Sequence, residues 1–451
     1  MLLCSRYVLP VSTEPFQDGA ILVRGGKILD IGPANMLKLR HPHEEIKDFG
    51  NAVLMPGLID LYSQIDNSVL RGLMPDAPYP EWVLAMLDYS QKMDKNDWYH
   101  SSLLGGLEAL SSGITTSANI TANSAPLEAV EDIGMRSVIY REVRAVDRHR
   151  IDDVMKKAEH DIDKWQASST SGLVTVGIAP GPVFTCHPAV FRAVSELANR
   201  KNIPVAMRLA GSQEECNFLC YGSSVFSVSE MQDRNVYMEI APWLPTGASP
   251  VRYALNWDAF EAENVMVIQG IYVNDEDIKK LKEYNVSIAT CPRSNAQLGM
   301  GVAPVMDYLK AGINVGFGTN SSAATEATDL IVEMRTGMQL QRAMRPADFI
   351  NSSTVLEMGT LGAARVLKMD DKIGSLEMGK CADIIAIDLS HSHQMPFDDP
   401  ASSIVNTCSG NDVLMTMVDG EIRYENSQWR VDVNVSECID RVIELREKLR
   451  A

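Results

Sequence analysis

Two rhythms of hydrophobic and polar positions divide the chain. The first fifty residues alternate apolar and polar positions, and Gly25-Gly26 in "GAILVRGGKILDIG" separates two strand-like runs as in a tight hairpin. The same alternation returns after about Gly374, where Asp419-Gly420 marks another hairpin turn. The chain ends in the pattern of an amphipathic helix. We therefore expect the two ends of the chain to pair in one small β-sandwich domain.

Between these ends, short apolar runs alternate with helical patterns. Eight runs have the length and composition of buried strands, and they span residues 53–60, 114–120, 137–143, 173–180, 203–210, 265–270, 286–292 and 313–319. Helical stretches separate most of them, such as "NDEDIKKLKEY", which Asn274 can cap. Eight β/α units in series predict an α/β fold, a (β/α)8 TIM barrel over residues 53–373, with the β-sandwich built from residues 1–52 and 374–451.

Composition and charge restrict the partners of the chain. The 451 residues carry 59 acidic and 41 basic side chains, and the net charge of -18 repels nucleic acid and anionic membranes. No apolar run could span a bilayer, and the first residues do not resemble a signal peptide. The eight cysteines are scattered, as is typical of free thiols in a reducing compartment. We expect a cytoplasmic protein that binds neither nucleic acid nor membranes.

Six ordered motifs resemble the amidohydrolase superfamily. They read "DGAILVRGGKILDIG", "LMPGLID", "CPRSNAQLGMG", "GFGTNSS", "GSLEMGKCADIIAIDLS" and "VDGEIRY". They are similar in particular to the branch of cytosine, guanine and S-adenosylhomocysteine deaminases and triazine hydrolases. The resemblance covers nearly the whole chain, agrees with the barrel, and implies a homodimer, which is common for this fold. Family membership alone does not give the reaction.

The resemblance also implies a metal site, and this chain departs from it. Members of that branch bind one divalent metal through an HxH pair after strand one, histidines that end strands five and six, and an aspartate that ends strand eight. The matching residues here are Tyr62, Gln64, Arg208, Gln269 and Asn320. Amides and a phenol are weak zinc ligands, and a guanidinium repels cations, so we expect no metal and no cofactor.

Two further positions of the family pattern carry glycine. The glutamate that shuttles protons three residues after the strand-five histidine corresponds to Gly211. The histidine that contacts substrate after strand four corresponds to Gly181. The side chains that the resemblance implies for proton transfer and for substrate contact are therefore missing at these two positions.

The residues at the former metal positions all keep hydrogen-bonding groups, which predicts a polar pocket that bonds itself, water or a ligand. Arg208 and Tyr62 are the candidate catalytic residues, since a guanidinium suits a small molecule with an anionic or carbonyl group. Tyr62 could donate a proton if a basic neighbour lowers its pKa. The alternatives are an ion pair of Arg208 with Asp60 or Glu142, and a Tyr62 that only hydrogen-bonds.

Other residues complete the expected pocket. Arg71 and Trp82 match family positions after strand one that line the substrate entrance. The candidate substrate-binding residues are Gln64, Gln269, Asn320, Glu142, Arg71 and Trp82.

Three motifs resemble catalytic or metal-binding sites, and each has a simpler structural interpretation. Cys186 and His187 are adjacent in sequence, and adjacent residues rarely face each other, so we expect a chance pair and not a nucleophile. Ser294 and Asn295 are expected to brace the loop after strand seven. The "HSH" at residues 391–393 lies in the β domain and is expected to be a solvated turn.

Three hypotheses for function remain. The first is a metal-independent enzyme that acts on a small nitrogen-rich molecule, such as a guanidine, ureide or heterocycle, by cyclisation, elimination or other C–N bond chemistry. The second is a catalytically inactive pseudoenzyme that serves as a binding or scaffold subunit. The third is a metal-dependent C–N hydrolase or deaminase with unusual ligands. The retained polar pocket favours the first.

Overall fold

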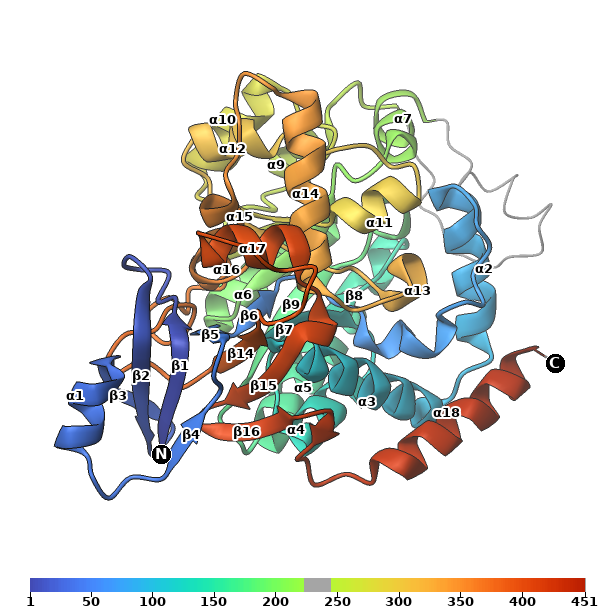
Figure 1. Cartoon of the computed structure of the whole chain (residues 1–451). Coiled ribbons are helices and arrows are strands. Elements are labelled where there is room, and N and C mark those ends of the chain that lie inside the picture. The colour runs from blue at the N-terminus through green and yellow to red at the C-terminus, as the bar shows by residue number, and fades with distance from the viewer. Residues whose placement is uncertain (223–244, 451) are drawn as a thin grey trace.

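The computed structural model describes residues 1–222 and 245–450, and a parallel barrel dominates them (Figure 1). Its strands run in chain order around the sheet. They are β6 (Leu58–Asp60), β7 (Ile114–Thr121), β8 (Arg136–Val143), β9 (Val174–Pro180), β10 (Val205–Leu209), β11 (Val265–Gln269), β12 (Ser287–Thr290) and β13 (Val315–Phe317). The N–H of Leu61 donates to the carbonyl of Phe317 at 2.9 Å and joins the first strand to the last. The predicted barrel is confirmed.

Helices follow the barrel strands and cover the outside. They are η1 (Ile65–Leu70), α2 (Tyr79–Gln91), α3 (Lys95–Ser111), α4 (Ala125–Ile133), η2 (Arg148–Arg150), α5 (Ile151–Ser168), η3 (Val183–Thr185), α6 (Ala189–Lys201), α7 (Gln213–Tyr221), α9 (Pro250–Asn256), α10 (Asp275–Glu283), α11 (Pro292–Gln297), α12 (Val305–Lys310), α13 (Ser322–Thr325), α14 (Leu330–Met344), α15 (Ser352–Met358) and α16 (Leu361–Val366). Asn274 caps α10 as expected, because its side chain accepts the N–H groups of Glu276 and Asp277.

A second, mixed sheet joins the two ends of the chain. It contains β1 (Leu2–Val8), β2 (Phe16–Arg24), β3 (Lys27–Pro33), β4 (Ile46–Asp48), β5 (Ala52–Pro56), β14 (Ile384–Asp388), β15 (Val413–Val418), β16 (Glu421–Glu425) and β17 (Gln428–Trp429). The antiparallel pairing of β5 with β14 links the N-terminal strands to the C-terminal ones, so the expected pairing of the two ends is confirmed. The strands form one connected sheet.

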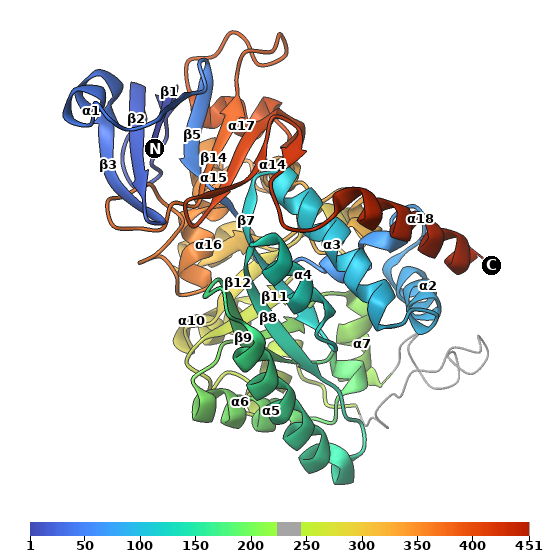
Figure 2. The ribbon, with the colours of Figure 1, turned by 90° about the horizontal axis from the view of Figure 1, so that it is seen from below.

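Three helices lie outside the barrel series. They are α1 (Ala34–Arg40) beside β2, α17 (Pro400–Thr407), and the C-terminal α18 (Val435–Arg450), with a short η4 (Gly410–Asp412) before β15. Figure 2 shows β1, β2 and β3 to one side of the barrel and α18 along α3. Within the described ranges, no helix is long and apolar enough to cross a membrane.

The first expected barrel strand is in fact two strands in two sheets. Residues 53–56 belong to β5 of the small sheet, and only residues 58–60 enter the barrel, as β6. The chain passes between the sheets at Gly57, where a β-carbon would lie 2.1 Å from the hydroxyl oxygen of Thr115. Both strands are fully buried, so the apolar run continues without a break and the single-strand prediction was wrong in its first half.

Apolar side chains fill the barrel below its carboxyl-terminal end. The inner cluster includes Ile59, Val138, Ala206, Met266, Ile268 and Ala289. Because this interior is packed, a functional site can form only at the strand ends, where the βα loops meet. The site is therefore built by the last residues of the strands and the first residues after them.

Candidate functional site

Arg208 lies across the mouth of the barrel. It is next to last in β10, and its Nη1 lies 3.3 Å from the hydroxyl oxygen of Tyr62, which follows β6 on the opposite side of the barrel. Its Nη2 forms an ion pair with Glu142 of β8. A long cation that reaches two other strand ends fixes the centre of the mouth, and the structure thus brings Arg208, Tyr62 and Glu142 together as one cluster.

Glu142 is the carboxylate that holds this cluster. One oxygen bonds Arg208, and the other lies 2.7 Å from Nη2 of Arg144, the residue just after β8. Burial alone would raise the pKa of Glu142, but Arg144 and Arg208 together lower it below its usual value. The carboxylate is ionised at neutral pH, so the internal ion pair of Arg208 with Glu142 is present.

Asp60, the other partner considered for Arg208, has a different role. Its carboxylate accepts the N–H groups of Tyr62 at 3.1 Å and Thr319 at 3.0 Å, and the Thr319 hydroxyl at 2.5 Å. Burial raises its pKa to about 6 although these bonds oppose the shift. Asp60 therefore braces the ends of strands one and eight beneath the mouth.

Tyr62 remains a neutral phenol at neutral pH. Burial raises its pKa, and the charge of Arg208 only partly opposes this. The idea that a basic neighbour lowers the pKa of Tyr62 is therefore wrong. Because the hydroxyl oxygen accepts a hydrogen bond from Arg208, its own proton points away from the guanidinium and can be donated to a bound molecule.

The two amides at strand ends six and eight adopt an unusual backbone. Gln269 and Asn320 are buried, with φ angles of 77° and 63°, in the left-handed region that non-glycine residues seldom adopt. The Asn320 N–H donates to the Tyr62 carbonyl at 2.7 Å, and the Gln64 N–H donates to the Asn320 carbonyl at 2.6 Å. Tyr62, Gln64 and Asn320 thus form one braced rim, while Gln269 ends β11, two strands away from β13 around the barrel.

The two glycines of the altered pattern make room for new neighbours. A β-carbon at Gly211 would lie 1.9 Å from the amide oxygen of Gln269. One at Gly181 would lie 2.7 Å from Cγ of Arg144. Each missing side chain is replaced in space by a side chain from an adjacent strand end.

Three titratable residues near this cluster were not predicted. Burial raises the pKa of Asp66 in η1 to about 7, with Glu142 adding to the shift and Arg208 opposing it. Burial raises the pKa of Glu215 to about 7, although its carboxylate accepts the N–H groups of Ala210 and Gly211 at 2.8 and 3.0 Å. Burial also raises the pKa of Tyr79, at the start of α2, against the charge of Arg208. The sequence signals were weak: a polar "DNS" after the first strand and an acidic helix start.

The entrance residues expected from the resemblance lie in different places. Trp82 of α2 is buried, and its Nε1 donates to the Ala323 carbonyl at 3.3 Å, so it joins α2 to α13, the short helix after β13. Arg71 instead forms an ion pair with Glu108 of α3. Its role at the entrance therefore stays a prediction. The helix α3, which the sequence pattern did not place against this loop, captures the guanidinium.

The Cys186–His187 pair does not form a nucleophile. The Cys186 thiol is buried, lies 3.5 Å from the Val143 carbonyl, and has its pKa raised to about 11 by burial. The Nδ1 of His187 accepts the N–H of Ala189 at 3.2 Å. Ser294 is buried and its hydroxyl donates to the Cys291 carbonyl at 3.1 Å, in agreement with a bracing role.

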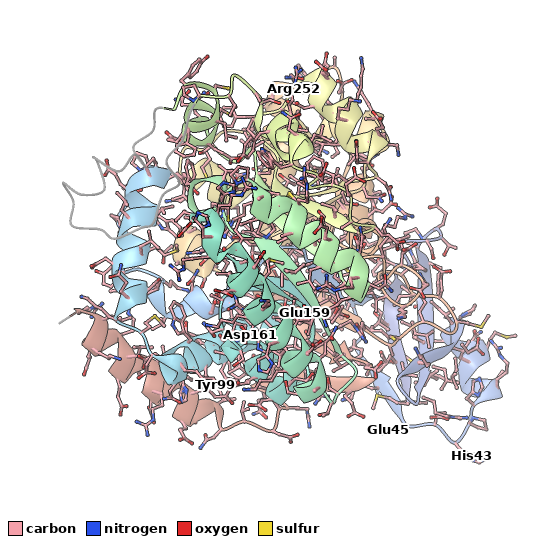
Figure 3. The ribbon with its side chains drawn as sticks, turned by 180° about the vertical axis from the view of Figure 1, so that it is seen from behind. His43, Glu45, Tyr99, Glu159, Asp161 and Arg252 are labelled. Atoms are coloured by element: carbon pink, nitrogen blue, oxygen red, sulfur yellow. The ribbon has the colours of Figure 1, made fainter. Side chains whose placement is uncertain are left out.

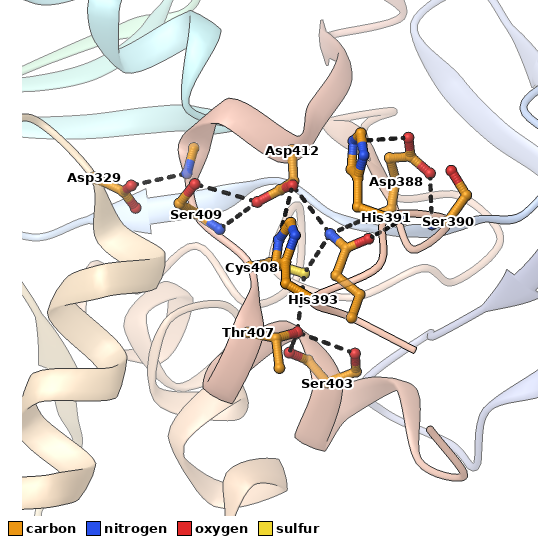
Figure 4. Close-up of polar contacts among 12 residues, drawn as sticks. Asp329, Asp388, Ser390, His391, His393, Ser403, Thr407, Cys408, Ser409 and Asp412 are labelled. Atoms are coloured by element: carbon orange, nitrogen blue, oxygen red, sulfur yellow. Dashed lines mark hydrogen bonds and ion pairs between the residues drawn. The ribbon is translucent and has the colours of Figure 1, made fainter. Parts of the chain in front are cut away.

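The "HSH" motif lies on the surface beside the small sheet (Figure 4). The rings of His391 and His393 stack with centroids 5.7 Å apart, and each faces a carboxylate, Asp388 at 3.3 Å and Asp412 at 3.7 Å. Both imidazoles are more than half exposed. In residues 1–222 and 245–450, no group of three or more histidine, cysteine or acidic side chains is arranged to hold a metal ion.

The donor set at the mouth does not fit the metal that the fold family implies. A guanidinium is a permanent cation with no lone pair to offer, and it occupies the strand-five position. The amides and the neutral phenol at the other positions are weak ligands. The carboxylates of Glu142 and Asp60 are already engaged, Glu142 with arginines and Asp60 with N–H and hydroxyl groups.

Comparisons with known proteins agree with the fold. The family model described as "Amidohydrolase family" matches residues 53–423, and a bacterial imidazolonepropionase-like composite domain matches residues 19–43. The chain is 28% identical over 425 residues, 94% of this chain and 93% of the relative, to a 5-methylthioadenosine/S-adenosylhomocysteine deaminase of Desulforudis audaxviator. It is 27% identical to a protein of the same name from Pyrococcus furiosus, over 95% of both chains.

Solved structures resemble the whole chain. An adenosine deaminase from Xanthomonas campestris with bound zinc matches with a TM-score of 0.85 at 21% identity, over 100% of this chain and 98% of that one. An atrazine chlorohydrolase from Arthrobacter aurescens complexed with zinc matches with a TM-score of 0.83 at 21% identity, over 99% of both chains. With a family model matched over most of its length and the barrel described above, this chain belongs to the amidohydrolase family.

Proposed function

We propose that this protein is a metal-independent enzyme that acts on a C–N bond of a small nitrogen-rich molecule, a guanidine, ureide or heterocycle. Arg208 and Tyr62 are its catalytic residues, and it works in the cytoplasm as a homodimer. The observation that carries the proposal is the position of Arg208, whose guanidinium lies across the mouth between Tyr62 and Glu142. The relatives, which are named as deaminases, support chemistry at a C–N bond.

The cluster offers hydrogen-bond donors where the family has a metal. The guanidinium of Arg208 and the hydroxyl of Tyr62 lie in hydrogen-bond contact at the mouth and can stabilise negative charge that develops on a carbonyl oxygen or ring nitrogen. Held in place by Glu142, the guanidinium needs no reorganisation during the reaction. Gln64, Gln269 and Asn320 would orient the substrate through their amides.

A substrate screen with metal analysis tests this proposal. The protein is purified without chelators, its metal content is measured, and turnover of a panel of guanidines, ureides and nitrogen heterocycles is followed before and after dialysis against dipicolinate. We expect turnover that survives dialysis and is abolished in Arg208→Met. Turnover that is lost with a stoichiometric divalent metal, or unchanged in Arg208→Met, contradicts the proposal.

A matched control is available on the outside of the barrel. Arg200 of α6 pairs with Glu159 of α5, a residue that Figure 3 labels, at 2.9 Å. The end of α6 lies at the amino-terminal end of the strands, far from the mouth, because the helix runs back along the barrel. Arg200→Met makes the same change of side chain as Arg208→Met, and we expect it to keep full turnover.

One observation favours a second candidate, a binding subunit without catalysis. Arg208 already has a carboxylate partner in Glu142, so its guanidinium has a counter-charge without a ligand. In that case the panel gives no turnover, while capture of the tagged protein from its native cells recovers a constant protein partner. Turnover of any panel member that depends on Arg208 rejects this second candidate.

A further inference from the structure

Arg144 is a second arginine at the mouth that the proposed function does not use. It directly follows β8, whose carboxyl end forms part of the rim. Its Nη2 lies 2.7 Å from Oε2 of Glu142, and its side chain is 46% exposed. A guanidinium that is anchored at one side and open to solvent at the other is available to a molecule that enters the mouth.

The absence of a side chain at Gly181 leaves the space that the Arg144 side chain occupies. The N–H of Gly181 donates to the Val143 carbonyl at 2.8 Å and holds the segment after β9 against the end of β8. A β-carbon at Gly181 would lie 2.7 Å from Cγ of Arg144 and 2.9 Å from the Thr185 hydroxyl oxygen. The aliphatic part of Arg144 thus lies over the bare Cα of Gly181, and any larger residue there would displace it.

The two guanidiniums at this point outnumber the carboxylates that bond them in the described residues. Arg144 and Arg208 share the single carboxylate of Glu142, one oxygen each. The Nε of Arg208 is buried and has no hydrogen-bond partner in the described ranges. Of the other nearby acids, Glu215 accepts two backbone N–H groups, and burial raises the pKa of both Glu215 and Asp66 to about 7. An unused guanidinium N–H beside a second guanidinium favours an anionic group.

We infer that Arg144 and Arg208 together bind a carboxylate of the substrate, so that the substrate is a small organic acid that also carries a guanidino, ureido or heterocyclic group. Glu142 spaces the two guanidiniums, and each keeps donors free for a second carboxylate. The inference rests on the proposed function because it uses the same site, and it narrows the substrates to acids.

Binding measurements test the inference without any need for turnover. The probes are N-carbamoylglycine, guanidinoacetate and imidazole-4-carboxylate, each compared with its uncharged primary amide by isothermal titration calorimetry. We expect at least one acid to bind the wild-type protein about tenfold or more tightly than its amide, because hydrogen bonds to charged groups are the strong ones. Arg144→Met should weaken that acid by about tenfold and leave the amide unchanged.

Two further variants keep the test decisive. Arg144→Lys retains the charge and loses the planar fork, so we expect an intermediate affinity. Gly181→Ala crowds Cγ of Arg144 and should weaken the acid without removing any charge. Arg200→Met should bind every probe as the wild type does. Should Arg144→Met fail to fold, Arg144→Lys and Gly181→Ala carry the comparison.

The inference is overturned if no acid binds the wild-type protein more tightly than its amide, or if Arg144→Met binds the acids unchanged. Its failure differs from failure of the proposed function. Metal-independent turnover of an uncharged substrate that depends on Arg208 would reject the acid and keep the function. Acid binding that depends on Arg144, together with turnover that is lost on dialysis against dipicolinate, would keep the acid substrate and reject the metal-independent function.

Discussion

The amide oxygen of Gln269 lies 1.9 Å from the position that a β-carbon of residue 211 would take, so Gly211 and Gln269 are a matched pair. They stand at the ends of the neighbouring strands β10 and β11. The φ of 77° at Gln269 directs its buried amide over the glycine. A glutamate at position 211, as the family pattern has it, could not be restored without moving Gln269.

The first prediction concerns this pair. Gly211→Ala should destabilise the fold by about 1–3 kcal/mol, because a buried methyl group is forced against the amide of Gln269. The backbone at Gly211 is not left-handed, so alanine itself is not strained there. In Gly211→Ala/Gln269→Ala the crowding disappears. Urea unfolding should therefore show that the double variant loses less unfolding free energy than the sum of the losses in the two single variants. Additive losses would show that the two residues do not compete for space.

The second prediction concerns the ion pairs of Glu142. Glu142→Gln removes the carboxylate that Arg208 and Arg144 share and leaves a largely buried guanidinium without that counter-charge, which should cost about 3–5 kcal/mol. Arg208→Met should cost less, since Glu142 keeps the half-exposed Arg144. Chemical unfolding at neutral pH measures both. A larger loss in Arg208→Met than in Glu142→Gln would show that Arg144 does not support the carboxylate.

Much of the fold follows from the sequence because buried parallel strands leave apolar runs of recognisable length. Seven of the predicted barrel strands lie where the structure has them, within a few residues. The run at residues 53–60 misleads because β5 and β6 are equally buried on two different sheets. Only Gly57 marks the crossing, and its role depends on how closely Thr115 approaches.

The site was partly predictable for a related reason. Arg208, Tyr62 and Glu142 meet because strand ends converge in any barrel, and the ion pair with Glu142 was one of the alternatives. Arg144 could not be predicted, since its place depends on the empty space over Gly181. The ion pair of Arg71 with Glu108 could not be predicted, because Glu108 comes from a helix that no local pattern positions.

The third prediction concerns the contact between the barrel and the small sheet. Arg136 at the start of β8 makes two parallel bonds to Asp383, at 2.7 and 3.0 Å, and both side chains are nearly buried. Arg136→Lys keeps the charge and cannot make both bonds, so we expect a loss of about 1–3 kcal/mol in unfolding free energy. Arg200→Lys at an exposed pair should cost about 0.5 kcal/mol or less. Equal losses in the two variants would argue against a special role for the Asp383 contact.

The fourth prediction is a pH dependence from Glu333 of α14. Burial raises its pKa from 4.5 to about 8, against the bond that one oxygen accepts from the Arg293 N–H at 2.7 Å. Its other oxygen has no partner in the described residues. Between these two pKa values the folded state holds more protons than the unfolded state, so the stability that this group contributes is present below pH 4.5 and is lost as pH rises toward 8.

Glu333→Gln removes this titration and keeps an acceptor for Arg293. Relative to the variant, the wild-type protein should lose stability with rising pH, by at most about 1.4 kcal/mol per pH unit for one proton. Urea unfolding of both proteins at several pH values between about 5 and 8 measures the difference. Because all other groups titrate alike in the two proteins, a difference that stays constant over this range would mean that Glu333 is already ionised in the folded barrel.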